Sequence, residues 1–275
     1  MATSTTRSNP TSTLPAPTAG DRLRESLNLK FMSLLLSTPR GRAHLLAQCA
    51  DAESTGESRI FDQALGGVDD ANLKRMITRH RDDELRHERL FRERLAATGV
   101  TDLPDLRDLQ VVDRIDAALG GFLEKPITDA RGVMEAYCLL QVLEERAVMQ
   151  FPIFAKAFAT IDPATTRVFE EVLEDERRHL LYCVAVSRRY APSEEAREAC
   201  LNRLRAIEAE EYKANQAANM RHAFKHGYVR GLASIPWRLL ALAAPLIPAA
   251  GTPHGRAGAK AHAVPDVAEL ARTAA

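Results

Sequence analysis

The sequence has few aromatic residues, few glycines and prolines, and no excess of charge of either sign. Aromatic side chains make up 5% of the 275 residues, and glycine and proline number 14 each. Because strands are enriched in aromatic and β-branched residues, this composition disfavours a sheet protein. Basic and acidic residues number 37 each, so the formal net charge is zero. This balance excludes a nucleic-acid-binding protein that relies on bulk charge, because counterion release needs a net basic face.

Several common motifs are also missing from the sequence. The cysteines at 49, 138, 183 and 200 form neither CxxC nor CxxH, and we interpret them as small core residues of a protein in a reducing compartment. The lack of GxGxxG, of a P-loop and of strand–helix alternation excludes nucleotide-binding α/β folds. Residues 1–20 are rich in Ser and Thr and lack the apolar run of a secretory signal. We predict a disordered leader there, with a transit peptide as the alternative, and a cytoplasmic protein.

Long helical segments separated by short breaks make up most of the chain. Thr38 caps a helix that has Pro39 in its first position and continues to Leu65, before two glycines. Further helices are predicted over 69–98, 129–158, 163–191 and 193–225, with one short helix in the connection 100–128. The first four long helices would each span roughly 40 Å at 1.5 Å per residue. We therefore expect an all-α four-helix bundle with a fifth, C-terminal helix, over residues 21–226.

The same pentapeptide pattern, D-E-x-R-H, occurs in two of these helices, at 83–87 and at 175–179. Its Glu and His are three residues apart and share a helix face, so a carboxylate oxygen and an imidazole nitrogen can bind one transition metal. Apolar residues continue both faces, which places the Glu and His inside rather than on a solvated surface. A carboxylate buried alone would be costly, whereas a cation between the groups compensates for burial. The repeat predicts a metal site.

Two metal ions need further oxygen ligands, and the helix turns help to select them. The first and third long helices offer Glu53, Glu57, Glu135, Glu144 and Glu145. In two antiparallel helices joined by a turn, residues at the same height are equally far from the turn along the sequence. Glu53 and Glu84 are equally far from the turn at 66–69. Glu144 and Glu176 flank the turn at 160–162 equally, and Glu144 continues an apolar stripe that Glu145 does not. Glu57 shares a face with Glu53 and remains the alternative to it.

The spacing of these residues also predicts the connectivity. Glu84 follows Glu53 by 31 residues and Glu176 follows Glu144 by 32, whereas 60 residues separate Glu84 from Glu144. The excess predicts a long crossover between the second and third bundle helices, the ferritin-like connection. The residues predicted to be catalytic and to bind metal are Glu53, Glu84, His87, Glu144, Glu176 and His179.

Three further residues are predicted to support these ligands. A metal-bound His usually donates its other N–H to a carboxylate, and we assign that role to Asp83 and Asp175, each toward the His of the opposite helix. An exposed helix acid is the alternative for either Asp. His80 lies one turn before Glu84 on the same stripe. We interpret it as a core or supporting histidine, with a third histidine ligand as the alternative.

Over residues 40–190, Glu53, Glu144 and the two D-E-x-R-H pentapeptides resemble the ferritin-like di-iron carboxylate proteins. The pentapeptide is similar to that of the oxygenases, desaturases and ribonucleotide reductase subunits of that group. The LEER at 143–146 and the apolar segment after the bundle resemble demethoxyubiquinone hydroxylases, although here Arg146 follows the acidic pair. His80, four residues before Glu-x-x-His, is similar to a histidine of the di-iron arylamine N-oxygenases, where it lies on the last bundle helix. The resemblance implies two iron ions, with manganese–iron as the other loading.

The function expected from this site is that of a di-iron monooxygenase-like oxidoreductase. It would use dioxygen and an external electron donor to hydroxylate or oxidise a small organic substrate. The alternative is a ferroxidase of the ferritin or rubrerythrin type, for iron storage or peroxide removal; the lack of a CxxC module disfavours a rubrerythrin. The sequence leaves the substrate, the donor and the formation of a homo-oligomer open.

Residues 228–250 form an apolar segment that prolines at 236, 245 and 248 and Arg238 interrupt. A spanning helix needs about 20 uninterrupted apolar residues, so this segment is predicted to be a lid on the bundle or a peripheral membrane contact. Membrane contact would favour a lipid-like or quinone-like substrate. We expect residues 251–275 to be a flexible tail.

Overall fold

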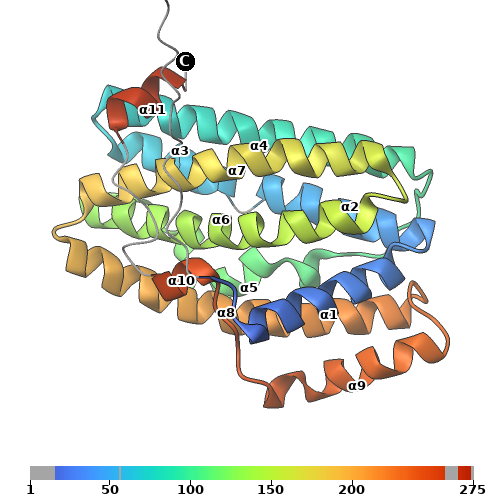
Figure 1. Cartoon of the computed structure of the whole chain (residues 1–275). Coiled ribbons are helices and arrows are strands. Elements are labelled where there is room, and N and C mark those ends of the chain that lie inside the picture. The colour runs from blue at the N-terminus through green and yellow to red at the C-terminus, as the bar shows by residue number, and fades with distance from the viewer. Residues whose placement is uncertain (1–15, 56, 258–265, 274–275) are drawn as a thin grey trace, which may run out of the picture.

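A computed structural model of the chain describes residues 16–55, 57–257 and 266–273, and no strand occurs among them (Figure 1). Most of the predicted leader, residues 1–15, lies outside this description. The α-helices are α1 (Ala19–Leu35), α2 (Pro39–Thr55), α3 (Glu57–Gly67), α4 (Ala71–Ala97), α5 (Val111–Ala118), α6 (Ala130–Phe158), α7 (Pro163–Tyr190), α8 (Glu194–Lys225), α9 (Ile235–Ala243), α10 (Pro253–Ala257) and α11 (Val267–Thr273). Short 3₁₀ helices are η1 (Arg107–Leu109), η2 (Phe122–Glu124), η3 (Leu232–Ser234) and η4 (Ala244–Leu246). The prediction of an all-α fold is confirmed for the described residues.

The long helices begin where short polar residues cap them. The side chain of Asp70 accepts hydrogen bonds from the backbone N–H groups of Asn72 and Leu73 at the start of α4. Asp129, Asp162 and Ser193 cap α6, α7 and α8 in the same way. Such caps satisfy N–H groups that lack a partner within the helix. These four helices lie within two residues of the ranges predicted from the sequence.

The N-terminal and C-terminal parts differ more from the prediction. The single helix expected up to Leu65 corresponds to α2 and α3, which are described on either side of residue 56, itself outside the described residues. Helix α1 begins inside the predicted leader, where Thr18 and Asp21 form a capping box. Helices α10 and α11 occur in the predicted tail, and Leu270 of α11 packs against the core. The apolar periodicity did not reveal α10 and α11, because each has only one or two turns.

Helices α2, α4, α6 and α7 lie side by side (Figure 1). Helix α2 packs against α4, α6 packs along α7, and α4 packs against α7. The chain between α4 and α6 contains η1, α5 and η2. Helix α8 covers α6, and α1, α5 and α9 lie around these two helices. None of the described helices combines the length and apolarity needed to cross a bilayer.

The apolar core is divided in two at mid-length. On α4, Met76 and Ile77 belong to one cluster and Phe91 to the other. On α7, Phe169 belongs to the second cluster and Tyr182 to the first. Between Ile77 and Phe91, the buried residues of α4 are His80, Asp83, Glu84 and His87, and α7 buries Asp175, Glu176 and His179 at the same level. A polar layer therefore lies between two apolar clusters. All four cysteines are free and buried, as expected for core residues.

Candidate metal centre

Seven acidic and histidine side chains meet in this polar layer, all of them buried. They come from α2, α4, α6 and α7 and form two groups whose ligand atoms lie within 4.8 Å of one another. The first group is His80, Glu84, Glu144 and His179, and the second is Glu53, Glu84, His87 and Glu176. Glu84 belongs to both groups. Two adjacent buried groups of this composition could bind two metal ions.

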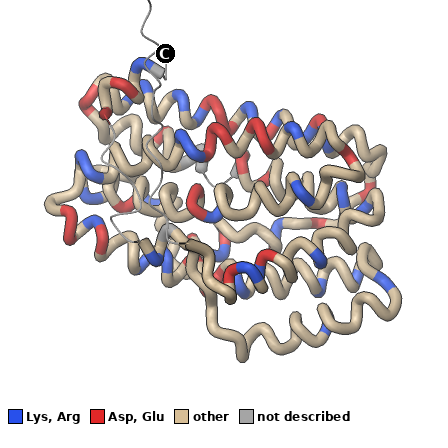
Figure 2. The backbone as a smooth tube through the Cα atoms, viewed as in Figure 1, with Lys and Arg blue, Asp and Glu red and all other residues tan. Residues whose placement is uncertain are grey.

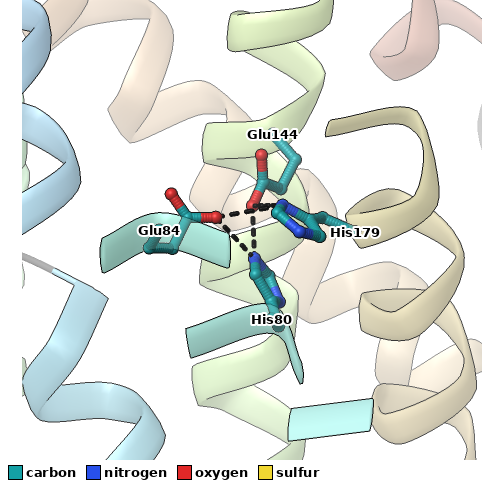
Figure 3. A group of neighbouring side chains, drawn as sticks. All are labelled: His80, Glu84, Glu144 and His179. Atoms are coloured by element: carbon teal, nitrogen blue, oxygen red, sulfur yellow. Dashed lines mark hydrogen bonds and ion pairs between the residues drawn. The ribbon is translucent and has the colours of Figure 1, made fainter. Parts of the chain in front are cut away.

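In the first group, two histidines face two carboxylates (Figure 3). The Nε2 atom of His80 lies 2.8 Å from Oε1 of Glu144 and 3.2 Å from Oε1 of Glu84. The Nδ1 atom of His179 lies 3.0 Å from the same Glu84 oxygen and 3.7 Å from Oε1 of Glu144. The two imidazole rings stack, with centroids 3.8 Å apart. One nitrogen of each ring therefore points to a common centre.

In the second group, one histidine faces three carboxylates. The Nδ1 atom of His87 lies 3.4 Å from Oε2 of Glu84, 3.5 Å from Oε1 of Glu176 and 3.8 Å from Oε2 of Glu53. Glu84 thus presents Oε1 to the first group and Oε2 to the second. A carboxylate in this position can join two cations, one through each oxygen.

The outer nitrogens of two histidines contact aspartates on the opposite helix. The Nε2 atom of His87 lies 3.2 Å from Oδ2 of Asp175, and Nε2 of His179 lies 3.4 Å from Oδ2 of Asp83. A carboxylate at Nε2 favours the tautomer with its proton there, which leaves the Nδ1 lone pair for a metal. Arg178 lies 2.6 Å from Asp83 and also pairs with Asp175, and Arg86 pairs with Asp175. These arginines connect the two halves of the motif.

The buried groups carry strongly perturbed pKa values in the protein itself. Burial and the neighbouring Glu84 raise the pKa of Glu53 well above its usual value. Burial and the neighbouring His179 lower the pKa of His80 to about 4. Burial opposes ionisation of His87 as well, but a hydrogen bond with Asp175 and the close carboxylates of the site raise its pKa. The carboxylates therefore require positive charge beside them, which protons or bound cations can supply.

Some atoms of the site lack a suitable hydrogen-bond partner. Among the described residues, the buried atoms Glu84 Oε1, His80 Nδ1 and His87 Nδ1 have none. The contacts of Glu84 Oε1 and His87 Nδ1 are to atoms of the two groups, without hydrogen-bond geometry. Oxygen and nitrogen lone pairs that converge in this way repel one another, and a metal ion between them would bind them all.

A cavity of about 170 Å³ reaches the site from one side. Its walls come from α1, α2, the η1–α5 connection, α6 and α8, and α4 and α7 contribute Glu84 and Glu176, so all four glutamates of the site line it. The three histidines are not among the described residues that line it. Apolar side chains such as Leu143, Ala147 and Phe151 continue the wall beyond the glutamates. The site therefore has a glutamate side that faces a cavity and a histidine side that faces the protein.

The structure brings together all six residues predicted as ligands. It also places His80, interpreted as a supporting residue, among the donor atoms of the first group. Glu145 points elsewhere: its Oε1 lies 2.6 Å from Arg205 of α8. Glu135 pairs with Arg131, and the side chain of Glu57 lies outside the described residues.

Sequence reasoning missed the arginines that pair with Asp83 and Asp175, and it missed the cavity residues of α8. Arg178 is the fourth letter of the second pentapeptide pattern, and its recurrence as Arg86 in the first was a visible signal for these contacts. The cavity residues of α8 gave no such signal, because only packing against α6 brings them to the site. Comparisons with models of known families, with curated proteins and with solved structures found no match to the chain. The metal centre is therefore inferred from the geometry of its side chains.

Proposed function

We propose that the two groups bind two iron ions, and that the protein is a ferritin-like di-iron oxidase or oxygenase acting on a small organic molecule. The observation that carries the proposal is the combination of two adjacent donor groups, sharing Glu84, with a cavity on their glutamate side. Manganese–iron is the other loading that this donor set accepts. An external electron donor completes the reaction.

Each residue of the two groups has a separate role in this proposal. His80, Glu144 and His179 would hold one ion, and Glu53, His87 and Glu176 the other, with Glu84 contributing to both. The chemistry that a pair of ferrous ions would supply is two-electron reduction of dioxygen. Asp83 and Asp175 keep protons on the outer histidine nitrogens and so keep the inner nitrogens free for the metals. The apolar cavity wall excludes water and holds the substrate beside the glutamates.

The cavity favours this function over iron storage. A storage protein must let many ferrous ions pass its oxidation site, and hydrated cations need a polar route. Here Leu143, Ala147, Phe151 and Phe154 line the cavity next to the glutamates. Apolar side chains next to the glutamates suit an organic substrate and dioxygen instead.

Anaerobic titration with ferrous iron, followed by addition of oxygen, tests the proposal. We expect two ions to bind per chain and oxygen uptake to stop once these two have reacted, unless a reductant is added. Oxidation of many ferrous ions per chain would indicate the storage function. Binding of no iron, or equal binding by a Glu176→Ala variant, would overturn the metal assignment. Glu174→Ala is the matched control, because Glu174 is an exposed glutamate of the same helix.

A further inference from the structure

The cavity extends beyond the metal groups along α8. Glu208, Tyr212, Asn215, Gln216 and Asn219 line it. Their spacing of three or four residues places them on one helix face, and from first to last they span roughly 16 Å at 1.5 Å per residue. The cavity therefore has a polar wall opposite its apolar one.

Most polar groups of this wall already have partners. Arg146 forms two hydrogen bonds with Glu208, of 2.7 and 2.8 Å, and lies over the ring of Tyr212. Gln216 donates to the Tyr212 hydroxyl at 2.9 Å. Because the charge of Arg146 is neutralised by Glu208, the wall offers no free cation to an acidic ligand.

Two amides of the wall are exceptions. Gln110, from the segment before α5, and Asn215 are 8% and 6% exposed. Among the described residues, Gln110 Nε2 and Asn215 Oδ1 have no hydrogen-bond partner. Both side chains line the cavity, and one has an unpartnered donor and the other an unpartnered acceptor. A buried amide atom without a partner is costly, so a complementary ligand group would be strongly preferred there.

The position of the amides leaves room for a ring beside the glutamates. Tyr212 pairs with Gln150, which is six residues, or about 9 Å, beyond Glu144 on α6. Asn215 lies almost one further turn along α8. A cavity of about 150 Å³ is known to hold benzene, and this one has about 170 Å³. Phe31, Phe151 and Phe154 supply apolar contacts for such a ring.

We propose that the cavity binds a small aromatic molecule with a neutral carboxamide-like group, which Gln110 and Asn215 hold while the ring faces the metal-binding glutamates. The inference that this molecule is a substrate rests on the proposed function. The inference that the cavity binds such a molecule does not. A carboxylate is disfavoured, because the site glutamates would repel it and Arg146 is already paired.

Binding of three probes of similar shape to the full-length protein tests this inference. Benzamide can donate and accept, acetophenone can only accept, and α-methylstyrene can do neither. We expect affinity, measured by ligand-observed NMR, to fall about five- to tenfold at each step. Asn215→Leu and Gln110→Leu should remove the preference for benzamide and keep binding of α-methylstyrene. Asn202→Leu, an exposed position of α8, is the matched control.

Equal binding of the three probes, no binding of benzamide, or an unchanged preference in both variants would overturn the inference. The measurements are made with and without ferrous iron. A protein that binds benzamide but no iron would contradict the proposed function and leave the amide site standing. A protein that binds iron but shows no preference among the probes would overturn the amide site and leave the proposed function standing.

A second, independent observation concerns the outer face of α9. Leu239 and Leu242 of α9, with Leu232 before it and Leu246 after it, are 62%, 72%, 84% and 87% exposed. On the inner face, Trp237 is buried and its ring lies 5.4 Å from that of Phe31. The helix is thus anchored by one side and presents a stripe of leucines on the other.

The charged residues around this stripe of leucines are all basic. The sequence has no Asp or Glu from 212 to 265, and Figure 2 shows no acidic residue on α9 or its connections. Arg230 and Arg238 are exposed beside the leucines. Exposed leucines bordered by cations are typical of helices that lie in the surface of an anionic bilayer. We infer that α9 docks on an anionic lipid surface.

Vesicle sedimentation tests this docking. The protein should bind phosphatidylcholine vesicles that contain about 30% phosphatidylserine and should bind pure phosphatidylcholine at least tenfold less. Leu239→Ser with Leu242→Ser should abolish binding, whereas Leu23→Ser, at another exposed leucine, should not. Equal binding of the double variant would overturn the inference, as would a lipid-independent dimer that the double variant abolishes.

Discussion

The two sides of the metal centre are built differently. On the histidine side, Asp83 and Asp175 hold the outer nitrogens of two imidazoles, and arginines pair with both aspartates. On the glutamate side, the same layer borders a cavity. The two sides therefore differ in rigidity. The outer nitrogens of His87 and His179 are held by aspartates, whereas the glutamates border a space that a substrate can enter.

The largest expected effect comes from the glutamate that both groups share. Glu84→Ala should abolish binding of both ions, whereas Glu53→Ala should remove only one, because Glu53 belongs to the second group alone. Metal analysis after anaerobic loading and desalting measures the stoichiometry. Equal losses in the two variants would show that Glu84 does not join the groups.

On the histidine side, His80→Ala separates a ligand from a supporting residue. His80 Nε2 lies among the donors of the first group, so its loss should remove one ion and keep the other. Competition with a coloured chelator, titrated ion by ion, measures this. Two ions bound with unchanged affinity would restore the interpretation of His80 as a core histidine.

A smaller effect is expected from the residues behind the histidines. Asp175→Asn should weaken metal binding about 10- to 100-fold without changing the number of ions, because it disturbs the orientation and basicity of His87. The same chelator competition gives the affinity. Asp105→Asn, an exposed aspartate outside the site, should have no effect.

The smallest effect concerns His44, a histidine on the cavity side that contacts no carboxylate of the site. Burial, together with His222 and His226, lowers its pKa to about 3. Because the folded value lies below the unfolded one, stability is lost as pH falls through about 6.5, where the unfolded chain gains the proton. Between pH 7 and 5 this amounts to about 2 kcal/mol.

Urea unfolding at the two pH values checks this prediction. His44→Leu should show a smaller loss of stability between pH 7 and 5 than the natural protein. His254→Leu is the comparison variant. An unchanged pH dependence in His44→Leu would contradict the burial of a neutral histidine.

The sequence predicted the parts of the site that depend on local spacing. Glu84 and His87 are three residues apart on one helix, and the apolar stripe favoured Glu144 over Glu145, which pairs with Arg205. The position of His80 among the donor atoms could not be predicted from spacing, because it depends on how closely α6 and α7 approach α4. Gln110 and Asn215 could not be predicted at all, since they reach the cavity only through packing of the connection and α8 around the bundle.

The polar layer between the two apolar clusters also bears on how the molecule unfolds. Without metal, the layer packs buried glutamates and histidines against one another in place of apolar contacts, so the two halves of the core are joined at their weakest point. Metal ions bound there would cross-link α2, α4, α6 and α7 at the level of this layer. Folding cooperativity then becomes a property of the loaded protein: one sharp thermal transition with metal, and separate melting of the two ends without it.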